Sequence, residues 1–103
     1  MNDTPSMNGA AGRILIADDE PSVRDSVGYA LAQEGFEVTA AEDGTDAEER
    51  LAGDFDFDLL ILDWQLPDLS GLQLLRWSRE HLDAPPPAIM LRIMSRKRSG
   101  PTV

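Results

Sequence analysis

Cysteine is absent from this chain of 103 residues, and no long hydrophobic run occurs in it. The lack of cysteine excludes a disulfide scaffold and a thiolate metal site, and it fits a reducing compartment. The longest aliphatic run, Leu59–Leu62, is far shorter than the roughly 20 apolar residues of a membrane helix. Residues 1–12 carry no Lys or Arg and so lack the basic start of a signal peptide. We therefore expect a soluble, cytoplasmic protein that does not bind membranes.

Positive charge is also scarce, because 9 Lys and Arg stand against 19 Asp and Glu, for a net charge of −10. This balance argues against direct nucleic-acid binding and against docking on an anionic membrane. All 19 acidic residues lie within residues 1–91, which contain five arginines and carry a charge of −14. Residues 92–103 contain four basic residues and no acidic ones, for a charge of +4. The charge thus changes sign near residue 92.

Short apolar runs alternate with segments of helical periodicity, and the length allows one small domain. The runs predict strands at 13–17, 36–40, 57–62 and 88–91. Strands that alternate with helices imply a parallel sheet covered by helices on both faces. The first helix is predicted to begin at Pro21 and to stop at Gly35. A capping box of Thr45 with Glu48 predicts the start of the second helix. A capping box of Ser70 with Gln73 predicts the start of the third, and Pro85–Pro87 breaks it.

Acidic residues follow two of the predicted strands. Asp18 and Asp19 come directly after the first strand, and Asp63 comes directly after the third. If these strands are neighbours, three carboxylates converge at one sheet edge, and a hard cation such as Mg²⁺ or Mn²⁺ relieves their repulsion. A carboxylate beside such a cation can act as a nucleophile toward a phosphoryl group. The alternative is that these acidic residues only cap helices and favour turns.

The motifs that carry these residues resemble one known family. The stretch Ile14–Glu20, the run Leu60–Asp63, and Pro67 with Gly71 resemble the receiver domain of two-component response regulators, over about residues 13 to 91. The resemblance implies a flavodoxin-like doubly wound parallel sheet of strand order 2-1-3-4-5. Gly71 would sit in the first turn of the third helix, where the missing Cβ allows close approach.

The resemblance also implies roles for individual residues. Asp63 would accept a phosphoryl group from a partner histidine kinase or phosphotransfer protein. Asp19, Asp63 and the backbone carbonyl of Gln65 would ligate Mg²⁺, and Asp18 would support the metal through water. The protein would then act in signalling and would not be an enzyme.

The sequence departs from the family pattern in its last part. Arg92 stands where receivers carry Ser or Thr at the end of the fourth strand, and Lys97 lies too near to it to act as the lysine of a fifth strand. We expect a sheet of strand order 2-1-3-4 that lacks the fifth strand, and a domain that lacks the last two helices. The predicted domain spans residues 13–94, between a flexible tail (1–12) and a basic tail (95–103). The exposed edge of the fourth strand predicts self-association. The tail is explained either by a truncated or frameshifted longer gene or by a solvated basic segment.

Three other functions are weighed against this one. An aspartyl-phosphate phosphatase needs a second Asp as general acid, where this chain has Gln65. An EF-hand that begins at Asp54 fails, because Leu59 and Gln65 replace its Gly and Glu. The main alternative is a degenerate receiver, which acts as an interaction module independent of phosphorylation or has no function. Arg92 and the missing lysine favour this alternative, and the intact acidic cluster disfavours it.

Overall fold

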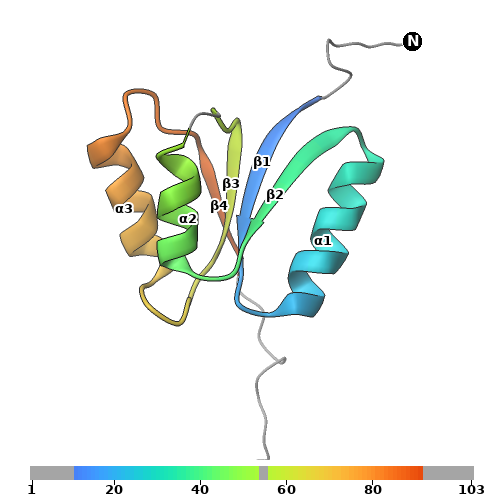
Figure 1. Ribbon diagram of the computed structural model, residues 1–103, viewed down its shortest axis with the longest axis horizontal. Coiled ribbons are helices and arrows are strands. Elements are labelled where there is room, and N and C mark those ends of the chain that lie inside the picture. The colour runs from blue at the N-terminus through green and yellow to red at the C-terminus, as the bar shows by residue number, and fades with distance from the viewer. Residues whose placement is uncertain (1–10, 54–55, 92–103) are drawn as a thin grey trace, which may run out of the picture.

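The computed structural model describes residues 11–53 and 56–91. Three helices and four strands alternate in this part of the chain (Figure 1). Their bounds are β1 Gly12–Ala17, α1 Pro21–Gln33, β2 Phe36–Ala41, α2 Gly44–Leu51, β3 Leu59–Asp63, α3 Gly71–His81 and β4 Ala88–Leu91.

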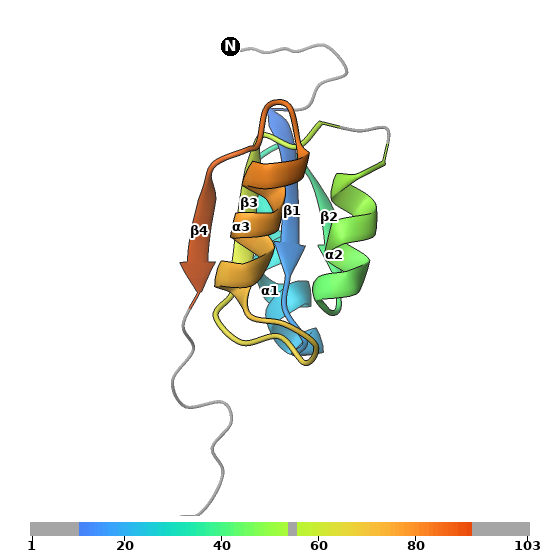
Figure 2. The same ribbon diagram turned by 90° about the vertical axis from the view of Figure 1, so that its left-hand side faces the viewer.

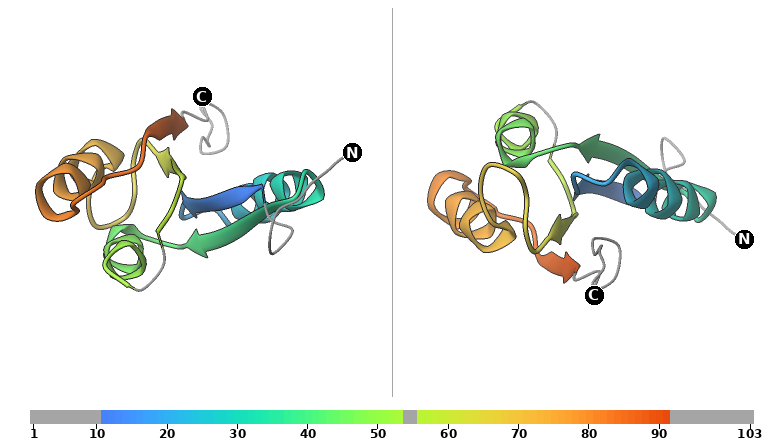
Figure 3. Two further views of the ribbon diagram at one scale, coloured as in Figure 1. Left: turned by 90° about the horizontal axis from the view of Figure 1, so that it is seen from above. Right: turned by 90° about the horizontal axis from the view of Figure 1, so that it is seen from below.

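The four strands form one parallel sheet in the order β2-β1-β3-β4. This order confirms the predicted flavodoxin-like doubly wound fold and places β1 beside β3, with Ala17 opposite Leu62. Because the strands are parallel, their carboxyl ends lie at the same edge of the sheet, toward the viewer in the right-hand panel of Figure 3.

Helices cover both faces of the sheet (Figures 1 and 2). One face packs against α1, where Val27 and Leu31 contact a cluster formed by alternate strand residues Ile14, Ile16 and Ile61. The other face packs against α2 and α3, in a larger cluster of Leu15, Ala17, Ala41, Ala47, Leu51, Phe57, Leu60, Leu62, Leu66 and Leu74. The central strands are therefore buried on both sides, which explains why their sequences are continuous apolar runs.

The first helix begins and ends as predicted, and the third begins as predicted but ends at His81, before the predicted breaker Pro85–Pro87. Pro21 occupies the first turn of α1, and Gly35 follows the helix with a φ of 97°, in the left-handed region that favours glycine. At α3 the predicted capping box is present, since the Ser70 side chain accepts from the Gln73 amide and the Gln73 side chain accepts from the Ser70 amide.

The predicted capping box at α2 is wrong. The N-cap is Asp43, whose side chain accepts a hydrogen bond from the Asp46 amide at 2.8 Å. The Thr45 hydroxyl instead donates to Asp68, which comes from a loop 23 residues later. The N-cap position that the sequence pattern assigned to Thr45 is therefore taken by Asp43, and the long-range carboxylate of Asp68 accepts from the first two amides of the helix.

Several expectations fall outside the described residues. These are the positions of Arg92 and Lys97, the predicted basic tail, and most of the predicted N-terminal tail. The start of β1 at Gly12 and that of β3 at Leu59 differ from the predicted starts by one and two residues. Among the helices of the described part, none is long and apolar enough to cross a membrane.

Candidate functional site

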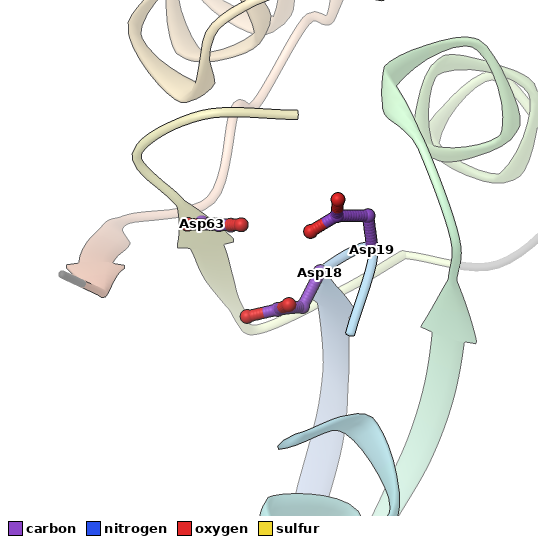
Figure 4. Close-up of side chains that lie close together, drawn as sticks. All are labelled: Asp18, Asp19 and Asp63. Carbon is purple, nitrogen blue, oxygen red and sulfur yellow. The ribbon is translucent and has the colours of Figure 1, made fainter. Parts of the chain in front are cut away.

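Three carboxylates meet at the carboxyl edge of the sheet (Figure 4). Asp18 and Asp19 follow β1, and Asp63 is the last residue of the neighbouring strand β3. One oxygen of each carboxylate lies within 4.8 Å of the others. Asp18 and Asp63 are 0% and 2% exposed, while Asp19 is more open to solvent. The structure thus brings together the three acidic side chains that the sequence singled out.

Backbone hydrogen bonds fix the segment that carries Asp18. Its amide donates to the Ala41 carbonyl of β2 at 3.1 Å, and its Oδ1 accepts from the Glu20 amide at 2.8 Å. The Arg24 guanidinium, from the first turns of α1, donates to the Asp18 carbonyl at 2.7 Å. These contacts attach the loop between β1 and α1 to β2 and to α1.

Asp63 is held by the loop that follows it. Its Oδ1 accepts from the Gln65 amide at 3.4 Å. The amide of Trp64, which directly follows Asp63, donates to the Leu91 carbonyl of β4 at 3.0 Å. Gly71 lies against this point, because a Cβ there would overlap the Asp63 carbonyl oxygen. The predicted close approach at Gly71 is confirmed, and the backbone that the glycine approaches is the last residue of β3.

The loop between β3 and α3 closes on itself. Gln65 and Ser70 form an antiparallel bridge, the Leu66 amide donates to Leu69 at 3.2 Å, and the Gly71 amide donates to Trp64 at 3.1 Å. We call residues 64–71 the acceptor loop. Its residues 65–70 and Asp19 line a pocket of about 430 Å³ beside the carboxylates. The Trp64 side chain is 43% exposed, as expected for an aromatic residue in a loop.

The electrostatics of the cluster favour a bound cation. Carboxylates within a few ångströms of one another repel, and each disfavours ionisation of the next. A donor set made only of carboxylate oxygens, with a backbone carbonyl nearby, has the chemistry that Mg²⁺ prefers. The side chains present at the site therefore fit a hard divalent cation.

Asp68, at the tip of the acceptor loop, has an unusual environment. The Thr45 hydroxyl, followed by the amides of Gly44 and Thr45, lowers the pKa of its carboxyl from 3.8 to about 2. Sequence reasoning missed this residue and also Arg24. Asp68 and its partners are 23 and 24 residues apart, so no local pattern could have revealed the contact. Arg24 carried a weak signal, since it is a basic residue one turn beyond an acidic loop.

Comparisons with known proteins identify the family. The family model of the response regulator receiver domain matches residues 14–99. The chain belongs to this family. The match extends eight residues beyond residue 91, the end of the resemblance expected from the motifs.

Known relatives agree with this assignment. The phosphate regulon transcriptional regulatory protein PhoB of Klebsiella pneumoniae is 40% identical over 82 residues, which cover 79% of this chain and 35% of the relative. The response regulator TrrA of Thermotoga maritima, solved in complex with Mg²⁺ and BeF, is 35% identical with a TM-score of 0.71, covering 84% of this chain and 74% of TrrA. A structure of the histidine kinase ThkA in complex with TrrA matches at 35% identity with a TM-score of 0.72, and the match covers 86% of this chain and 75% of the matched chain. The chain thus spans about a third of the length of the curated relative.

Proposed function

We propose that the chain is a phosphoacceptor receiver of a two-component phosphorelay in which Asp63 takes the phosphoryl group. The observation that carries this proposal is the convergence of Asp18, Asp19 and Asp63 within 4.8 Å at the carboxyl edge of the sheet. Ligands bind at this edge in open α/β folds, and a carboxylate here can attack phosphorus. Similarity to PhoB and TrrA supports the same role.

The proposal assigns a task to each residue of the site. A carboxylate oxygen of Asp63 forms a bond to phosphorus, while the bond between phosphorus and the donor's histidine nitrogen breaks and that imidazole leaves. Asp19, Asp63 and the Gln65 carbonyl would hold Mg²⁺, and Asp18 would hold it through water. Bound there, Mg²⁺ neutralises charge on the transferring phosphoryl oxygens. The Gln65 amide orients the Asp63 carboxylate through its hydrogen bond to Oδ1.

A histidine kinase or a phosphotransfer protein is the proposed donor. The ThkA–TrrA complex supports this choice, because TrrA shares the fold and 35% of the matched sequence. The degenerate receiver, which binds a partner without phosphorylation, is the alternative outcome.

Phosphoryl transfer is tested by incubating the full chain with a small phosphodonor and Mg²⁺ and measuring the intact mass. We expect the mass of one phosphoryl group in the wild type and none in Asp63→Asn. The matched control is Asp58→Asn, directly before the opposite end of β3, where the Asp58 side chain accepts from the Arg13 amide and does not reach the carboxylate site. This control should gain the group like the wild type. A wild type that gains no mass would favour the degenerate receiver.

Self-association through the outer edge of β4 stays a prediction. In the described part of the chain, β4 pairs on one side only, and Ile89 on this strand is 51% exposed. Unpaired strand edges pair readily with another chain. Sedimentation at increasing protein concentration should show a dimer that Ile89→Lys weakens, and a sedimentation coefficient independent of concentration would contradict the idea.

A further inference from the structure

Asp68 fastens the tip of the acceptor loop to the start of α2. Its Oδ1 accepts from the Gly44 amide at 2.8 Å, and its Oδ2 accepts from the Thr45 amide at 2.8 Å and from the Thr45 hydroxyl at 2.6 Å. Leu69 packs at the same place, since a Cβ on Gly44 would overlap its side chain. One side chain thus makes three hydrogen bonds between two segments that are distant in the sequence.

These hydrogen bonds are of the strong kind. The first amides of a helix have no partner within the helix, and a carboxylate that accepts from them is favoured by its charge and by the helix dipole. Asp68 satisfies the first two amides of α2, and the N-cap Asp43 satisfies the third. The tip of the acceptor loop is therefore attached to a rigid element.

The other end of the same loop reaches the carboxylates. The Gln65 amide donates to Oδ1 of Asp63, and Asp19, Gln65 and Asp68 line one pocket. Between the two ends, the bridge from Gln65 to Ser70 keeps the loop closed. The bridge therefore connects the segment beside Asp68 to the backbone of Gln65.

We propose that Asp68 is a positioning residue of the carboxylate site, which holds the acceptor loop against α2 and thereby fixes the Gln65 backbone beside Asp63. The inference rests on the proposed function where it takes the Gln65 carbonyl as a ligand of Mg²⁺. Residues that orient metal ligands from outside the first coordination sphere contribute strongly to metal affinity. Asp68 would act in this way through the loop backbone.

The simpler explanation is that Asp68 only caps α2. Asp43 provides the matched control, because its side chain caps the same helix through Asp46. Asp43→Ala and Asp68→Ala both remove a carboxylate from the N-terminus of α2, but only Asp68→Ala releases the acceptor loop. A role confined to helix stability predicts equal effects of the two changes on the site.

The experiment titrates the full chain with Mg²⁺ alone by calorimetry and measures amide hydrogen exchange in the acceptor loop. Asp68→Ala should raise the Mg²⁺ concentration at half-saturation about tenfold, and it should speed exchange of the Leu66 amide. Thr45→Val leaves the two backbone hydrogen bonds in place. It should therefore shift the Mg²⁺ half-saturation and the exchange rate of the Leu66 amide in the same direction, but by less. Asp43→Ala should lower the thermal midpoint but leave both quantities at the wild-type values. If Asp68→Ala fails to fold, Thr45→Val decides the question.

Two results would overturn the inference: an unchanged half-saturation in Asp68→Ala, or an equal shift in Asp43→Ala. Failure of the proposed function looks different, because the wild type itself would then gain no phosphoryl mass. If the wild type also binds no Mg²⁺, the role of Gln65 as a metal ligand is overturned with it. The exchange rate of the Leu66 amide still decides whether Asp68 holds the loop.

Discussion

Gly71 is the residue at which the packing of α3 and the geometry of the site meet. It begins α3, it is buried, and it approaches the carbonyl oxygen of Asp63 so closely that no Cβ fits between them. Its motif partner Pro67 lies in the acceptor loop that lines the pocket. The glycine in this motif therefore sets how near α3 stands to the end of β3.

Gly71→Ala should destabilise the fold by about 1–3 kcal/mol, the usual cost of overpacking, because the backbone oxygen of Asp63 cannot move aside as a flexible side chain could. Gly28→Ala is the matched control within a helix. A Cβ there meets only Val38, at an ordinary contact distance of 3.7 Å. It should stabilise the fold by about 0.5–1 kcal/mol. Urea unfolding measures both changes, and changes of the same sign would contradict this account.

At the scale of elements, the start of α2 is the point where local and long-range capping compete. Thr45 with Glu48 satisfies the local pattern of a capping box, yet Asp43 and Asp68 supply the acceptors. A fully charged carboxylate is a stronger acceptor for helix amides than a hydroxyl. The Thr45 hydroxyl is then available to donate to Asp68.

This capping predicts a dependence of stability on pH. The folded state lowers the pKa of Asp68 from 3.8 to about 2, first through the Thr45 hydroxyl. The stability that Asp68 contributes is therefore complete above about pH 3.8 and is lost as the pH falls toward 2. The difference in unfolding free energy between wild type and Asp68→Asn, measured by urea unfolding, should shrink over this range. Thr45→Val should reduce the pH dependence, and a difference that stays constant from pH 5 to about 2 would refute the assignment.

At the scale of the whole molecule, the sheet assembles three like charges at one edge. The pairing of β1 with β3 brings these carboxylates together, and repulsion between charges of one sign opposes folding. A ligand that binds only the folded state stabilises it in proportion to the logarithm of its concentration. Stability should therefore depend on divalent cations.

Mg²⁺ at about 100 times its dissociation constant should raise the free energy of unfolding by about 2.7 kcal/mol. Na⁺ at equal ionic strength should give only the smaller effect of screening. Asp19→Asn should raise the stability of the metal-free protein slightly, because it removes one of three like charges, and should weaken the response to Mg²⁺. Thermal unfolding measures the stability of the metal-free protein and its response to Mg²⁺ in the wild type and in Asp19→Asn. Equal effects of Mg²⁺ and Na⁺ on the wild type would show that the carboxylates hold no metal.

The sequence by itself determined the order of strands and helices along the chain, the parallel sheet and the three acidic residues at the strand ends. It could do so because apolar runs, helix caps and strand-end carboxylates are local patterns that survive in any fold of this class. The close approach of Gly71 was likewise predictable, since a motif of fixed spacing carries it.

Only the tertiary structure decided how the site is supported. The contact of Asp68 with α2 joins residues 23 and 24 positions apart. Such contacts depend on which strands are neighbours and on how the loops between them pack. The net charge of −10 gave no sign that three of these charges share one site. Their proximity follows from the position of β1 beside β3, which the periodicity of a parallel sheet alone leaves open and which the sequence predicted only through its resemblance to the receiver family.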